Sequence, residues 1–109
     1  MNATMILNRA EELREELIEN RRTLHSYAET GFDLPQTTAF VEKKLREYGL
    51  TPVRCGKAGI TCVIGDPKKG KCFLLRGDMD ALPMTEESGL PFAAQNGHCH
   101  SCGHDTHTA

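Results

Sequence analysis

The ten residues from His98 to His107 carry seven side chains that can bind a metal ion: four histidines, two cysteines and one aspartate. Thiolate, imidazole and carboxylate groups are the donors that hold zinc and its divalent neighbours. This density far exceeds what chance would place in a surface loop. The segment therefore predicts a metal site near the end of the sequence.

The spacing within this segment also indicates its backbone conformation. Cys102 and His104 are two residues apart, and side chains at i and i+2 point the same way only in an extended or loop segment. Gly103 between them allows the backbone to bend close to an ion. Asp105 suits the N-cap of a helix that begins near Thr106. We therefore expect the metal site to precede a helix.

Composition excludes several classes of protein. The 109 residues are 39% hydrophobic and 26% charged, as in an ordinary globular domain. A net charge of -2, with both signs mixed along the chain, offers no basic stripe for nucleic acid. No apolar run approaches membrane length, and the first twenty residues lack the apolar region of a secretory signal. We expect a cytoplasmic protein with no nucleic-acid or membrane partner and, with five cysteines, no disulfide framework.

Two helices are predicted in the first half of the chain. Apolar residues from Ile6 to Leu24 recur at helical spacing with glutamates on the opposite positions, which predicts an amphipathic helix over about 5–27. A second helix is predicted over about 35–48, because Pro35 suits a first helical position and Gly49 suits a C-terminal cap.

Short β-type runs follow the second helix, over residues 51–55, 60–64 and 72–76. The second and third runs are expected to pair as a hairpin. The third is continuously apolar from Cys72 to Leu75, which is typical of a strand covered on both faces. Helices should therefore lie on either side of the sheet, and the predicted fold class is α/β within one continuous domain portion.

A second polar cluster follows the most hydrophobic predicted strand and contains Asp78 and Asp80. In open α/β sheets, sites form beyond the carboxyl ends of strands, so both carboxylates are candidate ligands or partners that orient a histidine. Aspartates are also frequent in turns, where they bind the backbone. The histidine-rich segment downstream favours the functional alternative.

Four segments together resemble a known family. They are residues 24–32 (LHSYAETGF), 76–84 (RGDMDALPM), 87–92 (ESGLPF) and 100–109 (HSCGHDTHTA). In this order they are similar to metal-dependent amidohydrolases of the aminoacylase, hippurate hydrolase and indole-acetyl-amino acid hydrolase type, which are related to zinc carboxypeptidases and aminopeptidases. One departure is Ala28, where the family often has proline.

The resemblance implies roles for three residues. Cys102 and His104 match the metal ligands of the family's last motif, and Asp80 matches a catalytic aspartate that lies behind the metal site. His100, Asp105 and His107 match the motif less decisively as ligands. The implied cofactor is one or two divalent ions, with zinc, manganese, cobalt and nickel all compatible with such mixed donors.

The resemblance also implies a fold and a reaction. Residues 1–109 would be the N-terminal portion of a three-layer αβα catalytic domain, in which two helices precede the strands of a mixed sheet. The remaining ligands, the general-base glutamate and a dimerisation domain follow later in the family, so we expect this portion alone to be inactive. The expected substrate is a small N-acyl amino acid, whose amide bond is hydrolysed. The full-length enzyme is a candidate homo-oligomer.

Two alternatives come from the C-x-x-C formed by Cys99 and Cys102, which could belong to a small structural zinc module or to a redox pair. A knuckle completed by His104 and His107 would be tighter than usual zinc-finger spacing. A redox pair should open a helix directly after the first strand of a βαβ unit, and a long loop intervenes here. His25 is interpreted as a packing or capping residue near a helix end.

Overall fold

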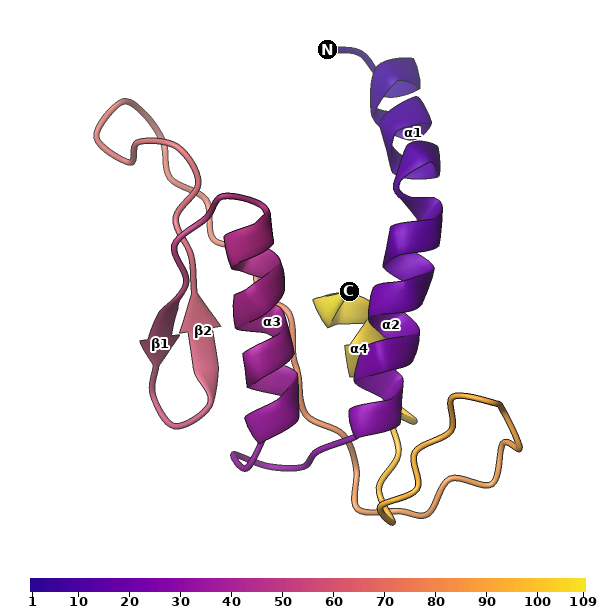
Figure 1. Ribbon diagram of the computed structural model, residues 1–109. Coiled ribbons are helices and arrows are strands. Elements are labelled where there is room, and N and C mark those ends of the chain that lie inside the picture. Colours follow the sequence, from indigo (N-terminus) through magenta and orange to yellow (C-terminus); the bar gives the residue numbers. More distant parts are fainter.

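Helices and one small sheet make up the regular structure, and the computed structural model describes residues 1–109. In chain order the elements are α1 (Ala3–Glu12), α2 (Arg14–Tyr27), α3 (Pro35–Glu47), β1 (Val53–Cys55), β2 (Gly59–Thr61) and α4 (His104–Thr108). Figure 1 shows α1 and α2 end to end, α3 alongside α2, and the hairpin beyond α3. The short helix α4 packs against α2, so the last residues return to the first half of the chain.

The predicted helix over 5–27 is present but divided. A turn at Leu13 separates α1 from α2. The Asn2 side chain caps α1 by accepting a hydrogen bond from the Met5 backbone N–H at 3.0 Å. The helix α1 buries no residue, whereas α2 buries Leu24 and His25. The apolar stripe of the N-terminal helix therefore contributes to packing only in its second half.

The predicted helix over 35–48 is confirmed as α3, with Pro35 in its first turn and Gly49 following it at a φ of 77°. Its N-terminus is capped from a distance. The buried Glu29 carboxylate accepts hydrogen bonds from the backbone N–H groups of Gln36 at 3.1 Å and Thr37 at 2.7 Å. A carboxylate in this place satisfies free N–H groups and complements the helix dipole, which fixes α3 relative to the end of α2.

The α/β class is confirmed, but the predicted strand pairing is wrong. Strands β1 and β2 pair antiparallel with Val53 opposite Thr61, whereas the segment over 72–76 forms no strand. Only three residues separate β1 from β2, and Gly56 takes a positive φ of 62° there. A short connection with a left-handed glycine favours the nearer partner, because closing it costs less entropy than closing the longer loop over 65–71.

Side-chain burial is concentrated where the two ends of the chain meet. Three alanines, Ala28, Ala81 and Ala94, form a small buried cluster between α2 and the later loops. In contrast, Phe73, Leu74 and Leu75 are 84%, 91% and 95% exposed. The run predicted to be covered on both faces therefore has no covering layer within these residues.

Hydrogen bonds fix the position of residues 78–82, which follow this exposed run. The Ala81 N–H donates to the Glu29 carbonyl at 2.7 Å, and Leu82 exchanges two 3.0 Å bonds with Cys99. The Thr108 hydroxyl donates to the Asp78 carbonyl at 2.7 Å. These contacts place residues 78–82 between the end of α2 and the histidine-rich segment. None of the helices is both long enough and apolar enough to span a bilayer.

The exposed run over 73–75 predicts self-association of the 109-residue chain. Contiguous apolar side chains and unpaired strand-like backbone are a template for contact with another chain. Sedimentation velocity should show a concentration-dependent increase in mass. Leu75→Lys should reduce the association, because this side chain is 95% exposed and the change costs the fold little.

Thr51→Lys provides the matched control, since it adds the same charge at another exposed position. A monomer at all concentrations, or equal effects of the two lysine substitutions, would contradict an apolar origin of the association.

Candidate metal centre

His104 and Asp80 are brought together, although 24 residues separate them. The His104 Nδ1 lies 3.0 Å from Asp80 Oδ1 and 2.9 Å from the Asp80 carbonyl oxygen. Both neighbours are acceptors, so the hydrogen is assigned to Nδ1, which donates to them. The lone pair of the neutral ring is then on Nε2, on the other side of the imidazole, where it is available to an ion.

Asp78 lies on the free side of the His104 ring. One Asp78 oxygen, Oδ2, is 3.7 Å from His104 Nε2, and Oδ1 is 3.8 Å from His107 Nδ1. The two imidazoles stack with centroids 5.5 Å apart. Donor atoms of Asp78, Asp80 and His104 all lie within 4.8 Å of one another. We call these three residues the candidate metal centre.

Local backbone geometry explains why these residues meet. Gly103 precedes α4 with a φ of 88°, a left-handed conformation that most residues disfavour. The helix therefore begins at His104, two residues earlier than predicted, and Asp105 is not its N-cap. Asp105 instead lies in the first turn with its side chain fully buried. The early start puts the His104 ring over residues 78–80.

Two of the three residues predicted for the site lie together in the structure, and the third does not. His104 and Asp80 belong to the candidate metal centre, while Cys102 is exposed and belongs to neither of the two groups of three or more potential donors in the structure. Asp78, the other candidate aspartate of the sequence, also belongs to the candidate metal centre. Cys102 precedes His104 by two residues and follows the buried His100 by two.

The second group of potential donors is formed by His25, Glu86 and Cys99. His25 is already occupied: Nε2 is 2.6 Å from Glu86 Oε1, and Nδ1 is 2.8 Å from Asp105 Oδ2. Burial, with a smaller contribution from the Glu86 carboxylate, raises the pKa of the Cys99 thiol, which disfavours the thiolate that metals require. In this arrangement the group offers an ion neither a free imidazole nitrogen nor a thiolate.

The pKa of Glu86 is lowered, in contrast to the raised pKa of Cys99. Burial raises its pKa, but hydrogen bonds from His25, from the Ala94 backbone N–H and from the Ser88 hydroxyl outweigh burial and hold the pKa below its usual range. The carboxylate is therefore charged at neutral pH. Sequence reasoning did not single out Glu86, because a glutamate in a polar loop carries no local signal of a partner 61 residues away.

His100 is buried, with 5% of its surface exposed and no hydrogen-bond partner at either ring nitrogen. The pKa of His100 is lowered, and burial is the largest cause of the shift, so the neutral imidazole is favoured. Its ring lies 6.2 Å from that of His25. His100 is not one of the three residues whose donor atoms meet at the candidate metal centre.

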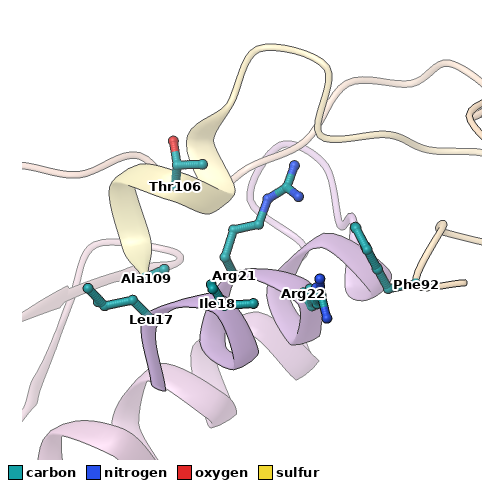
Figure 2. A pocket seen from close by; sticks show the side chains of 7 residues that line it. All are labelled: Leu17, Ile18, Arg21, Arg22, Phe92, Thr106 and Ala109. Carbon is teal, nitrogen blue, oxygen red and sulfur yellow. The ribbon is translucent and has the colours of Figure 1, made fainter. Parts of the chain in front are cut away.

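A pocket of about 410 Å³ lies beside α4 and is shown in Figure 2. Its lining consists of Leu17, Ile18, Arg21, Arg22, Phe92, Thr106 and Ala109. The guanidinium groups of Arg21 and Arg22 lie 5.5 and 5.1 Å from the Phe92 ring centroid. The lining includes no residue of the candidate metal centre.

Comparison with known proteins finds one family model, several relatives and similar solved structures. The model of peptidase family M20/M25/M40 matches residues 74–109. An N-acetyl-L-cysteine deacetylase of Bacillus subtilis (strain 168) is 43% identical over 100 residues, covering 89% of this chain and 24% of that protein. A crystal structure of a dinuclear metal-binding peptidase of the M20 family, from Bacillus subtilis, superimposes with a TM-score of 0.82 at 35% identity, covering 90% of this chain and 28% of that one.

A further relative is named as a ligase and not as a hydrolase. A Rhodococcus jostii (strain RHA1) protein named as a glutamate-cysteine ligase 2-3 is 44% identical over 109 residues, covering 97% of this chain but 14% of that protein. The chain thus spans a quarter or less of the length of these two curated relatives. A match to such a small part of the ligase-named protein transfers no ligase activity.

Gly77→Ala should displace α4 from residues 76–80. A Cβ at Gly77 would lie 2.9 Å from the His107 carbonyl oxygen, which is backbone and cannot rotate away. We expect a loss of about 1–3 kcal/mol in the free energy of unfolding, measured by urea titration, as for other overpacked sites.

Gly70→Ala is the matched control, because a Cβ there meets no atom within 4 Å and the backbone needs no positive φ. Equal stability of the Gly77→Ala and Gly70→Ala proteins would show that α4 does not pack against Gly77 as described.

Proposed function

We propose that this chain belongs to peptidase family M20/M25/M40, whose model matches residues 74–109, and that it is part of a metal-dependent amidohydrolase that cleaves the amide bond of N-acyl amino acids or similar small conjugates. The observation that carries the proposal is the free Nε2 of His104, oriented by Asp80 and two residues beyond a cysteine. The B. subtilis relative named as a deacetylase supports the substrate class.

We assign metal binding to Cys102 and His104. A thiolate and a neutral imidazole suit zinc and its divalent neighbours, so zinc, manganese, cobalt and nickel are all compatible with these donors. Cys102 is exposed, which leaves its thiol accessible to an ion. Asp78 faces His104 Nε2 at 3.7 Å and is a further candidate donor. Two ions are favoured over one by the relative described as a dinuclear peptidase.

Asp80 is assigned a role behind the metal. Its carboxylate accepts a hydrogen bond from His104 Nδ1, an arrangement that fixes the ring tautomer and makes Nε2 a better ligand. The Asp80 carbonyl oxygen holds the same N–H. Both oxygens come from one residue, so Asp80 sets the ring orientation through its backbone and its side chain together.

The chemistry follows from the bound ion and the polar groups beside it. When bound, a divalent ion polarises the scissile carbonyl and makes a coordinated water more acidic. Cys102 and His104 would hold the ion, and Asp80 would keep the His104 imidazole aligned. A carboxylate is also required to take a proton from the water and pass it to the leaving amine. We expect that base elsewhere in the enzyme.

We place residues 1–109 in the N-terminal portion of the catalytic domain. The 24% coverage of the B. subtilis deacetylase supports the chain being one part of a longer enzyme, and the order of the motifs in the family resemblance favours the N-terminal part. A catalytic metal needs about three protein ligands and an open position, so further donors are expected from other parts of the enzyme. A dimerisation domain, and assembly as a homo-oligomer, belong to the same proposal.

Serine substitutions at the two cysteines test the assignment of the ligand. In a full-length protein carrying this sequence, Cys102→Ser replaces a thiolate by a weakly binding hydroxyl. It should lower metal affinity and hydrolysis of N-acetyl amino acids by more than about 100-fold, beyond the range expected for a residue behind the ligands. His104→Ala should have a similar effect. Metal content is measured by elemental analysis and activity by release of the free amino acid.

Cys99→Ser is the matched control and should leave both quantities nearly unchanged. A structural zinc knuckle or a redox pair would need both thiols, so equal damage from the two serine substitutions would refute the amidohydrolase site.

A further inference from the structure

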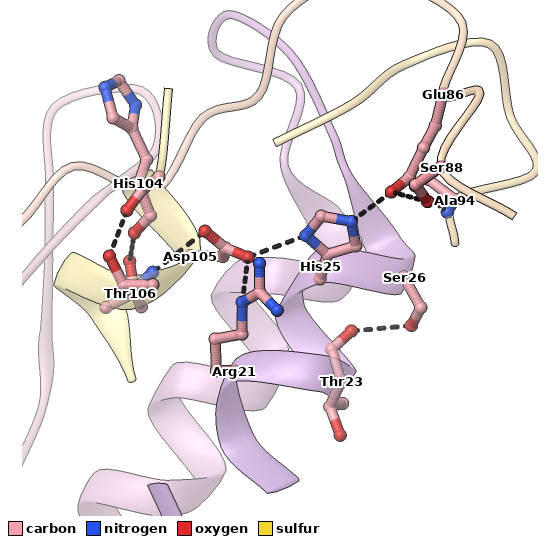
Figure 3. A network of polar contacts seen from close by, with 12 residues as sticks. Arg21, Thr23, His25, Ser26, Glu86, Ser88, Ala94, His104, Asp105 and Thr106 are labelled. Atoms are coloured by element: carbon pink, nitrogen blue, oxygen red, sulfur yellow. Dashed lines mark hydrogen bonds and ion pairs between the residues drawn. The ribbon is translucent and has the colours of Figure 1, made fainter. Parts of the chain in front are cut away.

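Two basic side chains of α2 converge on one buried carboxylate of α4. Arg21 Nε and His25 Nδ1 each lie 2.8 Å from Oδ2 of Asp105. The Asp105 side chain has no exposed surface. Figure 3 shows the carboxylate turned toward α2, between the Arg21 and His25 side chains. One oxygen of Asp105 therefore joins α4 to two successive turns of α2.

A second buried carboxylate lies on the other side of His25. Glu86 Oε1 is 2.6 Å from His25 Nε2, and the Glu86 and His25 side chains are 3% and 5% exposed. The other Glu86 oxygen accepts the Ala94 N–H at 2.6 Å, which ties the loop over 84–94 to the same point. We call Arg21, His25, Glu86 and Asp105 the buried ion network.

Basic and acidic side chains are paired throughout this network. Each His25 nitrogen faces a carboxylate oxygen, and Arg21 lies beside the same Asp105 oxygen as His25. Each of the two buried carboxylates therefore has at least one basic side chain as its partner. Such pairing matters because a buried charge that loses its partner is strongly destabilising.

The network reaches the candidate metal centre through a single peptide bond. Asp105 directly follows His104, and both lie in the first turn of α4. A five-residue helix cannot hold its own orientation, since isolated helices of this length are unstable in water. Its direction must therefore come from tertiary contacts, and Asp105 makes the most buried of them.

We propose that Asp105 and His25, braced by Arg21 and Glu86, are positioning residues that set the angle at which His104 meets a bound metal. Neither His25 nor Glu86 contacts the ion; they act through Asp105 and the axis of α4. This inference rests on the proposed metal-binding role of His104. It assigns a function to four residues distributed over α2, the loop over 84–94 and α4.

The experiment compares matched variants of the full-length protein carrying this sequence. His25→Ala removes the imidazole that lies between the two carboxylates. Glu86→Gln removes one charge at nearly constant shape, and Glu87→Gln makes the same chemical change at the adjacent exposed glutamate. Zinc affinity is measured by competition with a chelator. The absorption spectrum of the cobalt-loaded protein is recorded at saturating cobalt, where it reports the geometry around the ion.

We expect His25→Ala to weaken zinc binding by about 10–100-fold, the range for residues that orient a ligand. The cobalt d–d bands should shift at saturation. Glu86→Gln should change both quantities in the same direction by a smaller amount, and remains informative if His25→Ala does not fold. Glu87→Gln should match the parent protein in both measurements. Circular dichroism of the metal-free variants checks that each is folded.

The spectrum at saturation separates positioning from stability. A variant that is only less stable binds metal more weakly but, once loaded, has the parent spectrum. Parent-like cobalt spectra for folded His25→Ala and Glu86→Gln proteins would therefore overturn the inference. Cys99→Ser should keep the parent spectrum, and loss of metal in that variant would instead make His25, Glu86 and Cys99 a metal site. Failure of the proposed function is distinguishable, because the parent protein itself would then bind no metal.

Discussion

The contact between His25 and Asp105 spans 80 residues of sequence and joins the N-terminal helices to the histidine-rich segment over 98–107. It is short, fully buried and flanked by Arg21 and Glu86. Few apolar side chains support this junction, since its hydrophobic cluster consists of three alanines. Small side chains bury little area, so their hydrophobic contribution is modest. The geometry of the site therefore depends mainly on buried charges that must remain paired.

Backbone hydrogen bonds also hold the chain around the candidate metal centre in position. Ala81 donates to the carbonyl of Glu29 and Leu82 pairs with Cys99, so the backbone directly after Asp80 is held on two sides. Glu29 also caps α3 through its side chain. One short turn after α2 thus fixes a helix and presents a site residue at the same time. Rigid placement of this kind is what a ligand-orienting carboxylate requires.

Sequence patterns were most informative where structure is local. The helix over 35–48 was predicted from a proline, an apolar face and a glycine within one segment, and α3 matches it. The hairpin prediction failed because several runs had similar β character, and loop closure decided which of them paired. The start of α4 was missed by two residues because Gly103 adopts a left-handed conformation, which lets the helix begin at His104.

The sequence by itself determined the chemistry of this protein: the α/β class, the donor-rich segment over 98–107 and the aspartates after the predicted strand. Side-chain type and short-range spacing are properties of the chain before it folds. Tertiary structure alone decided that Asp80 orients toward His104, that Cys102 stays exposed, and that His25 lies between two carboxylates. Partners 24, 61 and 80 residues apart leave no periodic signal, because their meeting depends on the path of the whole chain.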